Sequence, residues 1–199
     1  MYYRICTEAL MSIKIYLDQG HNPRDYNTGA EGNGLYEQDI TYDIGLRLYR
    51  LLSANPDFEV RLSRPTADTV LGTNNSSSLT ARVREANSWG ADVFLSLHTN
   101  ASLNANATGS EALIYSRSSR VALGLAEDIL RELNLTTGLR NRGVIERPGL
   151  YVLRRTNMPA VLVEMGFITN PTDAELMAYS PELFARGIYR GILEYYGIR

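Results

Sequence analysis

The sequence predicts a single α/β domain, built on a mostly parallel central sheet that is flanked by helices on both faces. Short runs of β-branched and other apolar residues alternate with longer stretches that carry apolar residues at helical spacing, a pattern typical of this fold class. Several of the short runs are apolar throughout, as expected of strands covered on both faces. The length of 199 residues suits one domain, and no repeat, low-complexity tract or linker divides it.

The first half of the chain contains five predicted elements. Residues 13–17 form a β-rich run that predicts a strand, and residues 36–52 place isoleucine and leucine at helical spacing, which predicts a helix. Residues 58–62 alternate between apolar and polar side chains and are expected to form the second strand. A helix is predicted over 79–89, where it ends before a glycine. Residues 93–97 are almost all apolar, which indicates a strand buried on both faces.

The second half continues the alternation. Residues 112–115 are expected to form a strand, followed by an amphipathic helix over 119–133. Two further short apolar runs, 151–153 and 160–163, are expected to be strands. The chain closes with one or two helices between residues 174 and 196.

Two segments rich in serine and asparagine, 74–78 and 101–109, are the loops that we expect to be most mobile. Residues 1–11 are expected to be an N-terminal extension without a functional role, which leaves 12–199 as the catalytic domain. The extension lacks the charged start and the unbroken apolar run of a secretory signal. The sequence therefore does not explain how the protein is exported.

Composition narrows the possible partners. The formal net charge is only -2, and acidic and basic residues are interspersed, whereas a nucleic-acid or anionic-membrane footprint needs a clustered basic face. No stretch approaches the roughly 20 apolar residues that cross a bilayer, so no membrane span is expected. Cys6 is the only cysteine, which excludes an intramolecular disulfide and favours a small buried hydrophobe over a reactive thiol.

The unusual polar residues follow predicted strands. His21 comes just after the first strand, His98 directly follows 93–97, and Glu164 follows the last strand. Ligands of open α/β sheets bind at the carboxyl ends of the strands. Each histidine alone is more often a hydrogen-bonded core residue, and Glu37 alone could be an acid in the first turn of a helix. Together they match a catalytic zinc site, with three His or carboxylate ligands, one free position and a further carboxylate as base. Glu111 is expected to be a surface or supporting carboxylate.

Four segments also resemble a known family when they are taken in order. They are Leu17-Asp-Gln-Gly-His21 followed by Gly29–Gly32 and Glu37; Arg82 and Asn87 with Ala91-Asp92; Ser96-Leu-His-Thr-Asn-Ala101; and Val163-Glu-Met-Gly-Phe-Ile-Thr-Asn170. They are similar to the zinc-dependent N-acetylmuramoyl-L-alanine amidases of bacterial autolysins, spore-wall hydrolases and some phage endolysins. Each segment alone is weak, but the match extends over about residues 12–196 and carries every required ligand type.

The resemblance implies specific roles for four residues. It assigns His21, Glu37 and His98 as ligands of one Zn²⁺ ion. Glu164 becomes the general base, and later the acid that protonates the leaving amine. The bond that the family cuts joins the lactyl group of N-acetylmuramic acid to L-alanine of the stem peptide. The implied partner is therefore peptidoglycan, and the implied location is the cell wall or the extracellular space.

Two departures from the family pattern affect one loop. Asn22-Pro23 stand where the family commonly has two glycines, and Gln19 stands where a proline is frequent. Pro23 stiffens the loop and biases Asn22 away from helical conformation. Neither change removes a ligand, but the shape of the loop is expected to differ.

Three residues are candidate substrate contacts: Asn100, which adjoins His98, and the arginines Arg64 and Arg140. A stem peptide carries free carboxylates, which guanidinium groups bind in a planar fork. Between His98 and Glu164, the predicted elements already occupy the chain and leave no room for the inhibitory helix of regulated family members. We therefore expect a domain that needs no protein activator.

Two alternatives remain. The first is a zinc peptidase that trims stem peptides, and the second is a wall-binding module without catalysis. A degenerate relative usually loses a ligand or the base, and none is missing here, which disfavours the second. The sequence does not distinguish an autolysin from a spore-wall enzyme or an endolysin, and it is silent on oligomeric state.

Overall fold

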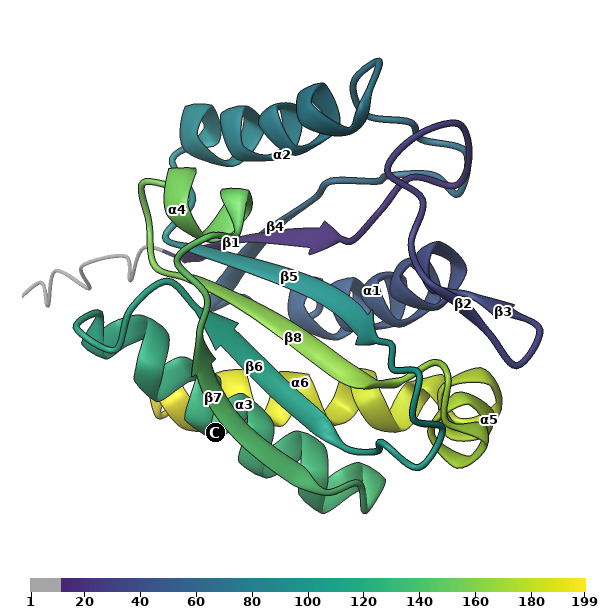
Figure 1. Cartoon of the computed structure of the whole chain (residues 1–199). Helices are drawn as coiled ribbons and strands as arrows, with labels where there is room; N and C mark the ends of the chain where they lie inside the picture. Colours follow the sequence, from purple (N-terminus) through teal and green to yellow (C-terminus); the bar gives the residue numbers. More distant parts are fainter. Residues whose placement is uncertain (1–11) are drawn as a thin grey trace, which may run out of the picture.

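The computed structural model describes residues 12–199, and its centre is a six-stranded sheet (Figure 1). The strands are β1 (Ile13–Gln19), β4 (Phe58–Leu62), β5 (Val93–Asn100), β6 (Ser110–Ile114), β7 (Asn141–Glu146) and β8 (Ala160–Phe167). Their order across the sheet is β4-β1-β5-β8-β6-β7. Strands β4, β1, β5 and β8 run parallel. Strand β6 is antiparallel to β8 and parallel to β7, so the sheet is mostly parallel, as predicted.

Helices cover both faces of the sheet. They are α1 (Glu37–Ser53), α2 (Asn75–Trp89), α3 (Arg120–Thr137), α4 (Tyr151–Arg155), α5 (Pro171–Tyr179) and α6 (Pro181–Tyr196). Helices α1, α3 and α6 bury apolar side chains against one face, whereas α2 and α4 pack on part of the other (Figure 1). The predicted fold class is therefore confirmed. Within residues 12–199, none of the helices has the length and apolar character to cross a membrane.

The central strand β5 shows how the sheet is buried on both faces. Phe94 and Leu95 are both fully buried. Phe94 packs in the apolar cluster under α2 and α4, and Leu95 packs in the cluster under α1, α3 and α6. Side chains alternate between the faces of a sheet along a strand. Residues an even number of positions beyond Phe94, including Ser96 and His98, therefore face the α2 and α4 side.

A two-stranded hairpin leads from the first strand into α1. Its strands are β2 (Glu31–Gly32) and β3 (Leu35–Tyr36). Asn33 and Gly34 form the turn, with φ angles of 52° and 75°, which are the positive values that an Asn-Gly hairpin turn requires. Asn33 Nδ2 also donates to the carbonyl oxygen of Ile168 at 2.8 Å. This contact ties the hairpin to the segment that follows β8 and thereby places the start of α1.

The strand expected at 151–153 is wrong, because this segment forms the short helix α4. Val152 and Leu153 are buried in the apolar cluster beside α2, and a run of three apolar residues cannot distinguish a helix from a strand by its periodicity. The strand of this region is β7, at 141–146. It lies at the edge of the sheet and is largely polar, so its sequence gives only a weak strand signal.

The loop expected at 74–78 is also wrong, since α2 begins there at Asn75. Asn74 is its N-cap: the side chain accepts a hydrogen bond from Ser77 N at 2.9 Å, and Ser77 Oγ accepts one from Asn74 N at 3.0 Å. This reciprocal capping box satisfies backbone donors at the helix start. Residues 101–109 are irregular, as expected. The proposed extension at 1–11, with Cys6, lies outside the described residues.

Candidate metal centre

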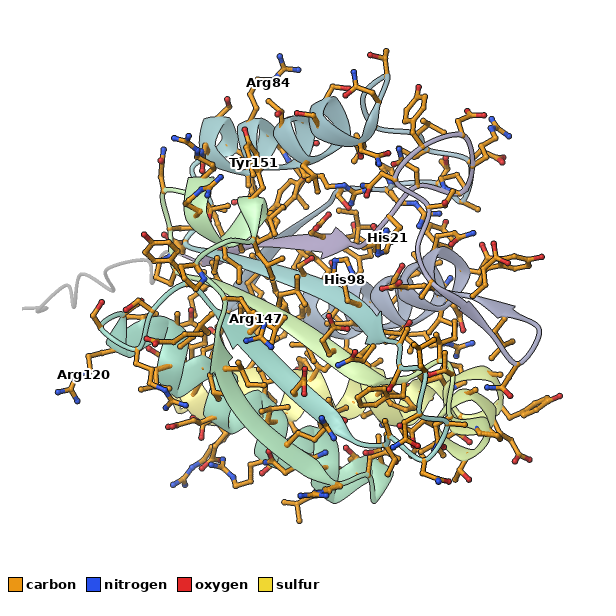
Figure 2. The ribbon with its side chains drawn as sticks, in the orientation of Figure 1. His21, Arg84, His98, Arg120, Arg147 and Tyr151 are labelled. Carbon is orange, nitrogen blue, oxygen red and sulfur yellow. The ribbon has the colours of Figure 1, made fainter. Side chains whose placement is uncertain are left out.

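Two imidazoles and one carboxylate converge at the carboxyl end of the parallel strands. His21 lies two residues beyond β1, His98 lies within β5, and Glu37 is the first residue of α1. Figure 2 shows the two histidines next to each other at this end of the sheet. Glu37 Oε1 lies 3.1 Å from His21 Nε2 and 3.0 Å from His98 Nδ1. All three donor atoms lie within 4.8 Å of one another, so a single metal ion could contact all of them.

The ring of His21 is oriented so that one nitrogen is free for a metal. Nδ1 lies 3.2 Å from the carbonyl oxygen of Asn27. Because a carbonyl oxygen only accepts hydrogen bonds, Nδ1 carries a proton, and Nε2, which faces Glu37, is the nitrogen that a metal ion would contact. A hydrogen bond of this kind fixes the tautomer and the orientation of metal-binding histidines.

Glu37 is buried and held by the backbone on both oxygens. Its Oε2 accepts from Ala30 N at 2.8 Å, and its Oε1 accepts from Thr99 N at 2.9 Å. Burial by itself would raise the pKa of Glu37, but the hydrogen bonds and charges of His21 and His98 outweigh it, so the pKa lies well below its ordinary value. Its place at the start of a helix also favours the ionised form. Glu37 therefore presents a carboxylate at neutral pH.

Two glycines permit the close approach of these side chains. A Cβ at Gly20 would lie 2.5 Å from Cε1 of His98, and a Cβ at Gly29 would lie 2.6 Å from Oε2 of Glu37. Real Cβ atoms do not approach other atoms this closely, so any larger residue would displace the ring or the carboxylate. The absence of a side chain at these two positions is thus part of the geometry of the centre.

Glu164 lies beside this cluster, in register with His98 across β5 and β8. Its Oε2 is buried, and it has no hydrogen-bond partner among residues 12–199. Burial, followed by the negative charges of Glu37 and Glu111, raises the pKa of Glu164 to about 8. A carboxyl group whose pKa lies near neutrality can both take up and release a proton, which makes Glu164 a candidate acid and base.

Glu111 lies beside Glu164 and is buried, so it is not the surface carboxylate that the sequence also allowed. It is the register partner of Glu164 across β6 and β8. Its Oε1 accepts from Asn100 Nδ2 at 3.0 Å, and its Oε2 accepts from Arg142 Nε at 2.8 Å. The guanidinium of Arg142 also lies 4.9 Å from the centre of the Phe167 ring. These contacts fix a row of polar side chains on the side of Glu164 away from His98.

The structure brings Asn100 to this row, but Arg140 is not part of it. Arg140 is exposed just before β7, and its backbone oxygen accepts from Ser110 N. Arg142 is the arginine at the site, and sequence reasoning missed it. A correct assignment of β7 would have found Arg142, because cross-strand pairing with β6 places it beside Glu111.

Arg64 does not fit the role of a substrate contact. Its side chain is 1% exposed. Nη1 donates to the carbonyl oxygen of Gln38 at 2.8 Å, and Nη2 donates to that of Ala67 at 3.1 Å. Burial also lowers the pKa of this guanidinium to about 10. The sequence placed Arg64 correctly after a strand, but it could not show that α1 covers it. Arg64 braces the first turn of α1 instead.

The loop with Asn22 and Pro23 is ordered by the asparagine side chain. Asn22 is fully buried. Its Nδ2 donates to the carbonyl oxygens of Tyr26 and Leu71, and its Oδ1 accepts from Leu71 N at 3.2 Å. These bonds close the loop that carries His21 onto the segment before α2. The departure from the glycine pattern therefore coincides with a stiffened loop.

A small cavity of about 110 Å³ adjoins the two histidines on the side of α2 and α4. Its other walls include Leu79, Leu150 and Tyr151. The centre therefore has hydrocarbon on one side and the polar row of Glu111 on the other. A substrate that spans the centre must therefore place an apolar group against the hydrocarbon side and a polar group against the side of Glu111.

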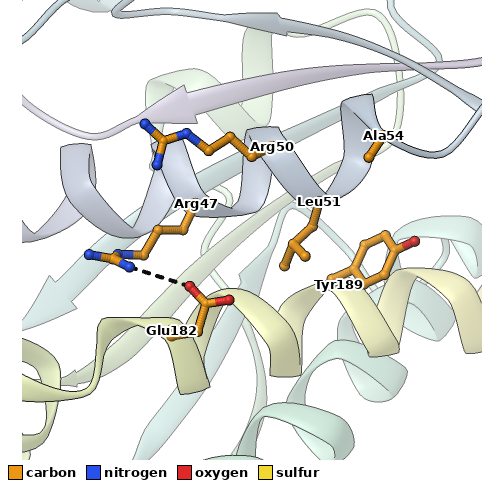
Figure 3. A pocket seen from close by; sticks show the side chains of 6 residues that line it. All are labelled: Arg47, Arg50, Leu51, Ala54, Glu182 and Tyr189. Carbon is orange, nitrogen blue, oxygen red and sulfur yellow. Dashed lines mark hydrogen bonds and ion pairs between the residues drawn. The ribbon is translucent and has the colours of Figure 1, made fainter.

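Another hollow lies between α1 and α6 (Figure 3). Its lining includes Arg47 and Glu182, whose side chains form an ion pair of 3.4 Å. Since α1 and α6 pack on the face opposite to His98, this hollow takes no part in the metal centre.

The arrangement can support metal-assisted hydrolysis. A metal ion held by three protein donors keeps a coordination position for water or substrate. Glu164 adds a buried carboxyl group that can exchange a proton close to that position. This combination suits attack by water on an amide or ester carbonyl.

Comparison with known proteins agrees with this reading. A family model described as N-acetylmuramoyl-L-alanine amidase matches residues 15–194. The chain is 39% identical over 180 residues to N-acetylmuramoyl-L-alanine amidase CwlM of Bacillus licheniformis, covering 90% of this chain and 65% of the relative. It is 39% identical over 186 residues to the amidase LytC of Bacillus subtilis (strain 168), covering 92% of this chain and 35% of LytC. The chain thus spans less than two thirds of the length of these relatives.

Solved structures give the same result for the fold. The crystal structure of N-acetylmuramoyl-L-alanine amidase from Clostridium difficile 630 superposes with a TM-score of 0.83 at 32% identity. The match covers 94% of this chain and 97% of the other. The α/β architecture is therefore common to both proteins over nearly their whole length.

Proposed function

Because this chain belongs to the N-acetylmuramoyl-L-alanine amidase family, we propose that it is a zinc enzyme that hydrolyses the amide between the lactyl group of N-acetylmuramic acid and L-alanine in peptidoglycan. One observation carries the proposal beyond the family name. Two imidazoles and a carboxylate converge beside Glu164, a buried carboxyl with a pKa of about 8. The chain therefore keeps both a complete donor set and a candidate base.

The donor set fits one zinc ion. His21 Nε2, His98 Nδ1 and Glu37 Oε1 would hold it, and imidazole and carboxylate ligands in this number are those of catalytic zinc sites. The hydrogen bond from His21 Nδ1 to Asn27 O supports this assignment, because it leaves the correct ring nitrogen free. When bound, zinc supplies a Lewis acid that polarises the scissile carbonyl and lowers the pKa of an attacking water.

Glu164 moves the proton. As the water oxygen attacks the carbonyl carbon, Glu164 takes a proton from that water. The same carboxyl then gives the proton to the nitrogen of L-alanine as the carbon–nitrogen bond breaks, so the products are a free lactyl carboxylate and a stem peptide with a free amine. A single group can serve both steps because its pKa lies close to neutrality.

The remaining polar residues would orient the substrate. Asn100 remains a candidate contact for the stem peptide, and Arg142 joins it as a guanidinium fixed beside Glu111 at the site. Arg140 lies outside this row of polar side chains. The hydrocarbon wall of Leu79, Leu150 and Tyr151 suits the methyl groups that flank the scissile amide. Residues 12–199 would carry the whole activity, with peptidoglycan as the partner and the cell wall as the place of action.

Digestion of purified muropeptides by the zinc-loaded protein tests the proposal. An amidase releases the intact stem peptide with a free N-terminal L-alanine, which mass spectrometry identifies. A zinc peptidase would instead cut within the stem, and a wall-binding module would leave the muropeptide intact. The digestion contains no second protein, so a reaction that starts only after a partner is added would overturn the expectation that no activator is needed.

A further inference from the structure

We propose that Arg82 is a positioning residue for zinc binding, which locks the backbone of His21 and joins it to the strand that carries His98. This inference rests on the proposed function in one respect only, namely that the bound metal ion is zinc. Arg82 lies on α2 and is not one of the candidate metal ligands, and its side chain is 1% exposed. Nothing in the chemistry of hydrolysis requires a buried guanidinium at this place, so its contacts must explain it.

The guanidinium group of Arg82 donates hydrogen bonds to the residues just before His21, to His21 itself and to the residue just after it. Nη2 donates to the carbonyl oxygen of His21 at 2.6 Å and to Asn22 Oδ1 at 3.2 Å. Nη1 donates to the carbonyl oxygen of Gln19 at 2.8 Å and to Asp18 Oδ1. Planar, multiple donation of this kind is specific to arginine, because a lysine ammonium cannot span acceptors in a fixed fork.

The backbone of His21 needs such a restraint. Its φ of 69° lies in the left-handed region, which a residue with a Cβ adopts only at an energetic cost. The conformation persists only where surrounding contacts impose it. Arg82 binds the carbonyl oxygen of His21 itself, while Thr41 Oγ1 binds the carbonyl oxygen of Gly20 at 2.8 Å. This backbone conformation sets the position from which the side chain of His21 leaves the chain, and the hydrogen bond to Asn27 O then orients the ring.

The same network reaches the second histidine. Asp18, the charged partner of Arg82, accepts a hydrogen bond from Ser96 Oγ at 2.8 Å. Ser96 lies two residues before His98 in β5 and faces the same side of the sheet. Arg82 and Asp18 thus connect the segment of one metal ligand with the strand of the other. Without this link, the distance between the imidazole rings of His21 and His98 is expected to become more variable.

The test compares zinc affinity in two lysine variants of α2. Arg82→Lys keeps a positive charge opposite Asp18 but loses the fork. Arg84→Lys is the matched control, because Arg84 lies on the same helix and points away from the sheet into solvent (Figure 2). Zinc dissociation constants are measured by competition with a chelator on protein that circular dichroism shows to be folded. We expect a rise of about 10–100-fold for Arg82→Lys, the usual effect of losing a group that orients a metal ligand, and no change for Arg84→Lys.

Activity gives a second readout. If Arg82 acts through zinc, saturating zinc restores most of the turnover of Arg82→Lys, and the defect appears only at low zinc.

An Arg82→Lys protein that is folded and binds zinc as tightly as the wild type would refute the proposal. Should this variant not fold, the double variant Asp18→Asn with Arg82→Met, which leaves no buried charge unpaired, takes its place. If neither folds, Arg82 serves the fold as a whole and the proposal is rejected. A wild type that binds zinc but cuts no muropeptide would sink the proposed function and leave this comparison valid.

Discussion

His98 and Glu164 are register partners in the neighbouring parallel strands β5 and β8. Paired residues of adjacent strands leave the sheet on the same face. A candidate metal ligand and the candidate base therefore stand side by side on the face that α2 and α4 only partly cover. Substitution of each residue in turn can distinguish the role of metal ligand, proposed for His98, from the role of general base, proposed for Glu164.

Glu164→Gln is expected to abolish hydrolysis of muropeptides while zinc content stays near that of the wild type. The change removes the proton acceptor but no donor to the metal, and loss of an acid or base alone costs about 10²–10⁴-fold in rate. Elemental analysis and the rate of stem-peptide release are measured on the same preparation. Full turnover by Glu164→Gln would show that another group is the base.

His98→Ala supplies the opposite phenotype. It removes one of three donors, so zinc is expected to be lost during purification together with activity. Elemental analysis after dialysis decides the outcome, with Glu164→Gln as the control. Retention of one equivalent of zinc by His98→Ala would exclude this residue as a ligand.

The stability of the metal-free protein is expected to fall with rising pH because of Glu164. The folded state raises the pKa of this carboxyl to about 8, so the folded state holds the proton more tightly than the unfolded state does. The protonated carboxyl makes its full contribution to the free energy of unfolding below its ordinary pKa of about 4.3. This contribution is lost as the pH rises to about 8. At about 1.4 kcal/mol per pKa unit, the loss reaches a few kcal/mol.

Denaturant unfolding of wild type and Glu164→Gln in the presence of a chelator, from pH 5 to pH 9, measures this loss. The variant lacks the titration, so its advantage over the wild type should grow across the range. Two curves that stay parallel would mean that Glu164 is not the group responsible.

Gly20→Ala is expected to weaken zinc binding. The new methyl group would lie 2.5 Å from Cε1 of His98 and 2.6 Å from the backbone oxygen of Leu97 in β5, so the ring of His98 and the segment at residue 20 must both shift. Gly149→Ala is the control, since a Cβ there meets no atom within 4 Å. Chelator competition on both variants checks the prediction, and equal affinities would contradict it.

Asn100→Ala is expected to raise KM for muropeptides more than it lowers kcat, if this amide contacts the stem peptide. Arg140→Met provides a comparison at the exposed position before β7. An effect confined to kcat for Asn100→Ala would instead point to disturbance of Glu164 through Glu111, whose Oε1 is bonded to Asn100. Steady-state kinetics on a single defined muropeptide separates these outcomes.

The spacing of apolar residues predicted most of the helices and strands, and the elements that it missed have a feature in common. Long amphipathic stretches such as α1 and α3 were predicted because burial of one helical face leaves a periodic trace. Short or edge elements leave almost none: α4 buries only a few residues, and β7 is polar because it lies at the rim. The start of α2 was missed because the polar residues that suggest a loop are also those that cap a helix.

The amino-acid sequence by itself determined the fold class, and its resemblance to the amidase family singled out the candidate site residues His21, Glu37, His98 and Glu164. The structure extends the two strands, so that His98 and Glu164 lie within β5 and β8 instead of directly after them. Parallel strands bring their carboxyl ends to one edge of a sheet, which is why residues from distant segments could be expected to meet there. Only the tertiary structure decided that Arg64 is buried, that Arg142 rather than Arg140 stands at the site, and that Glu164 has a pKa near 8. Burial and hydrogen bonding of a polar side chain depend on segments distant in the chain, and these leave no mark on the local sequence.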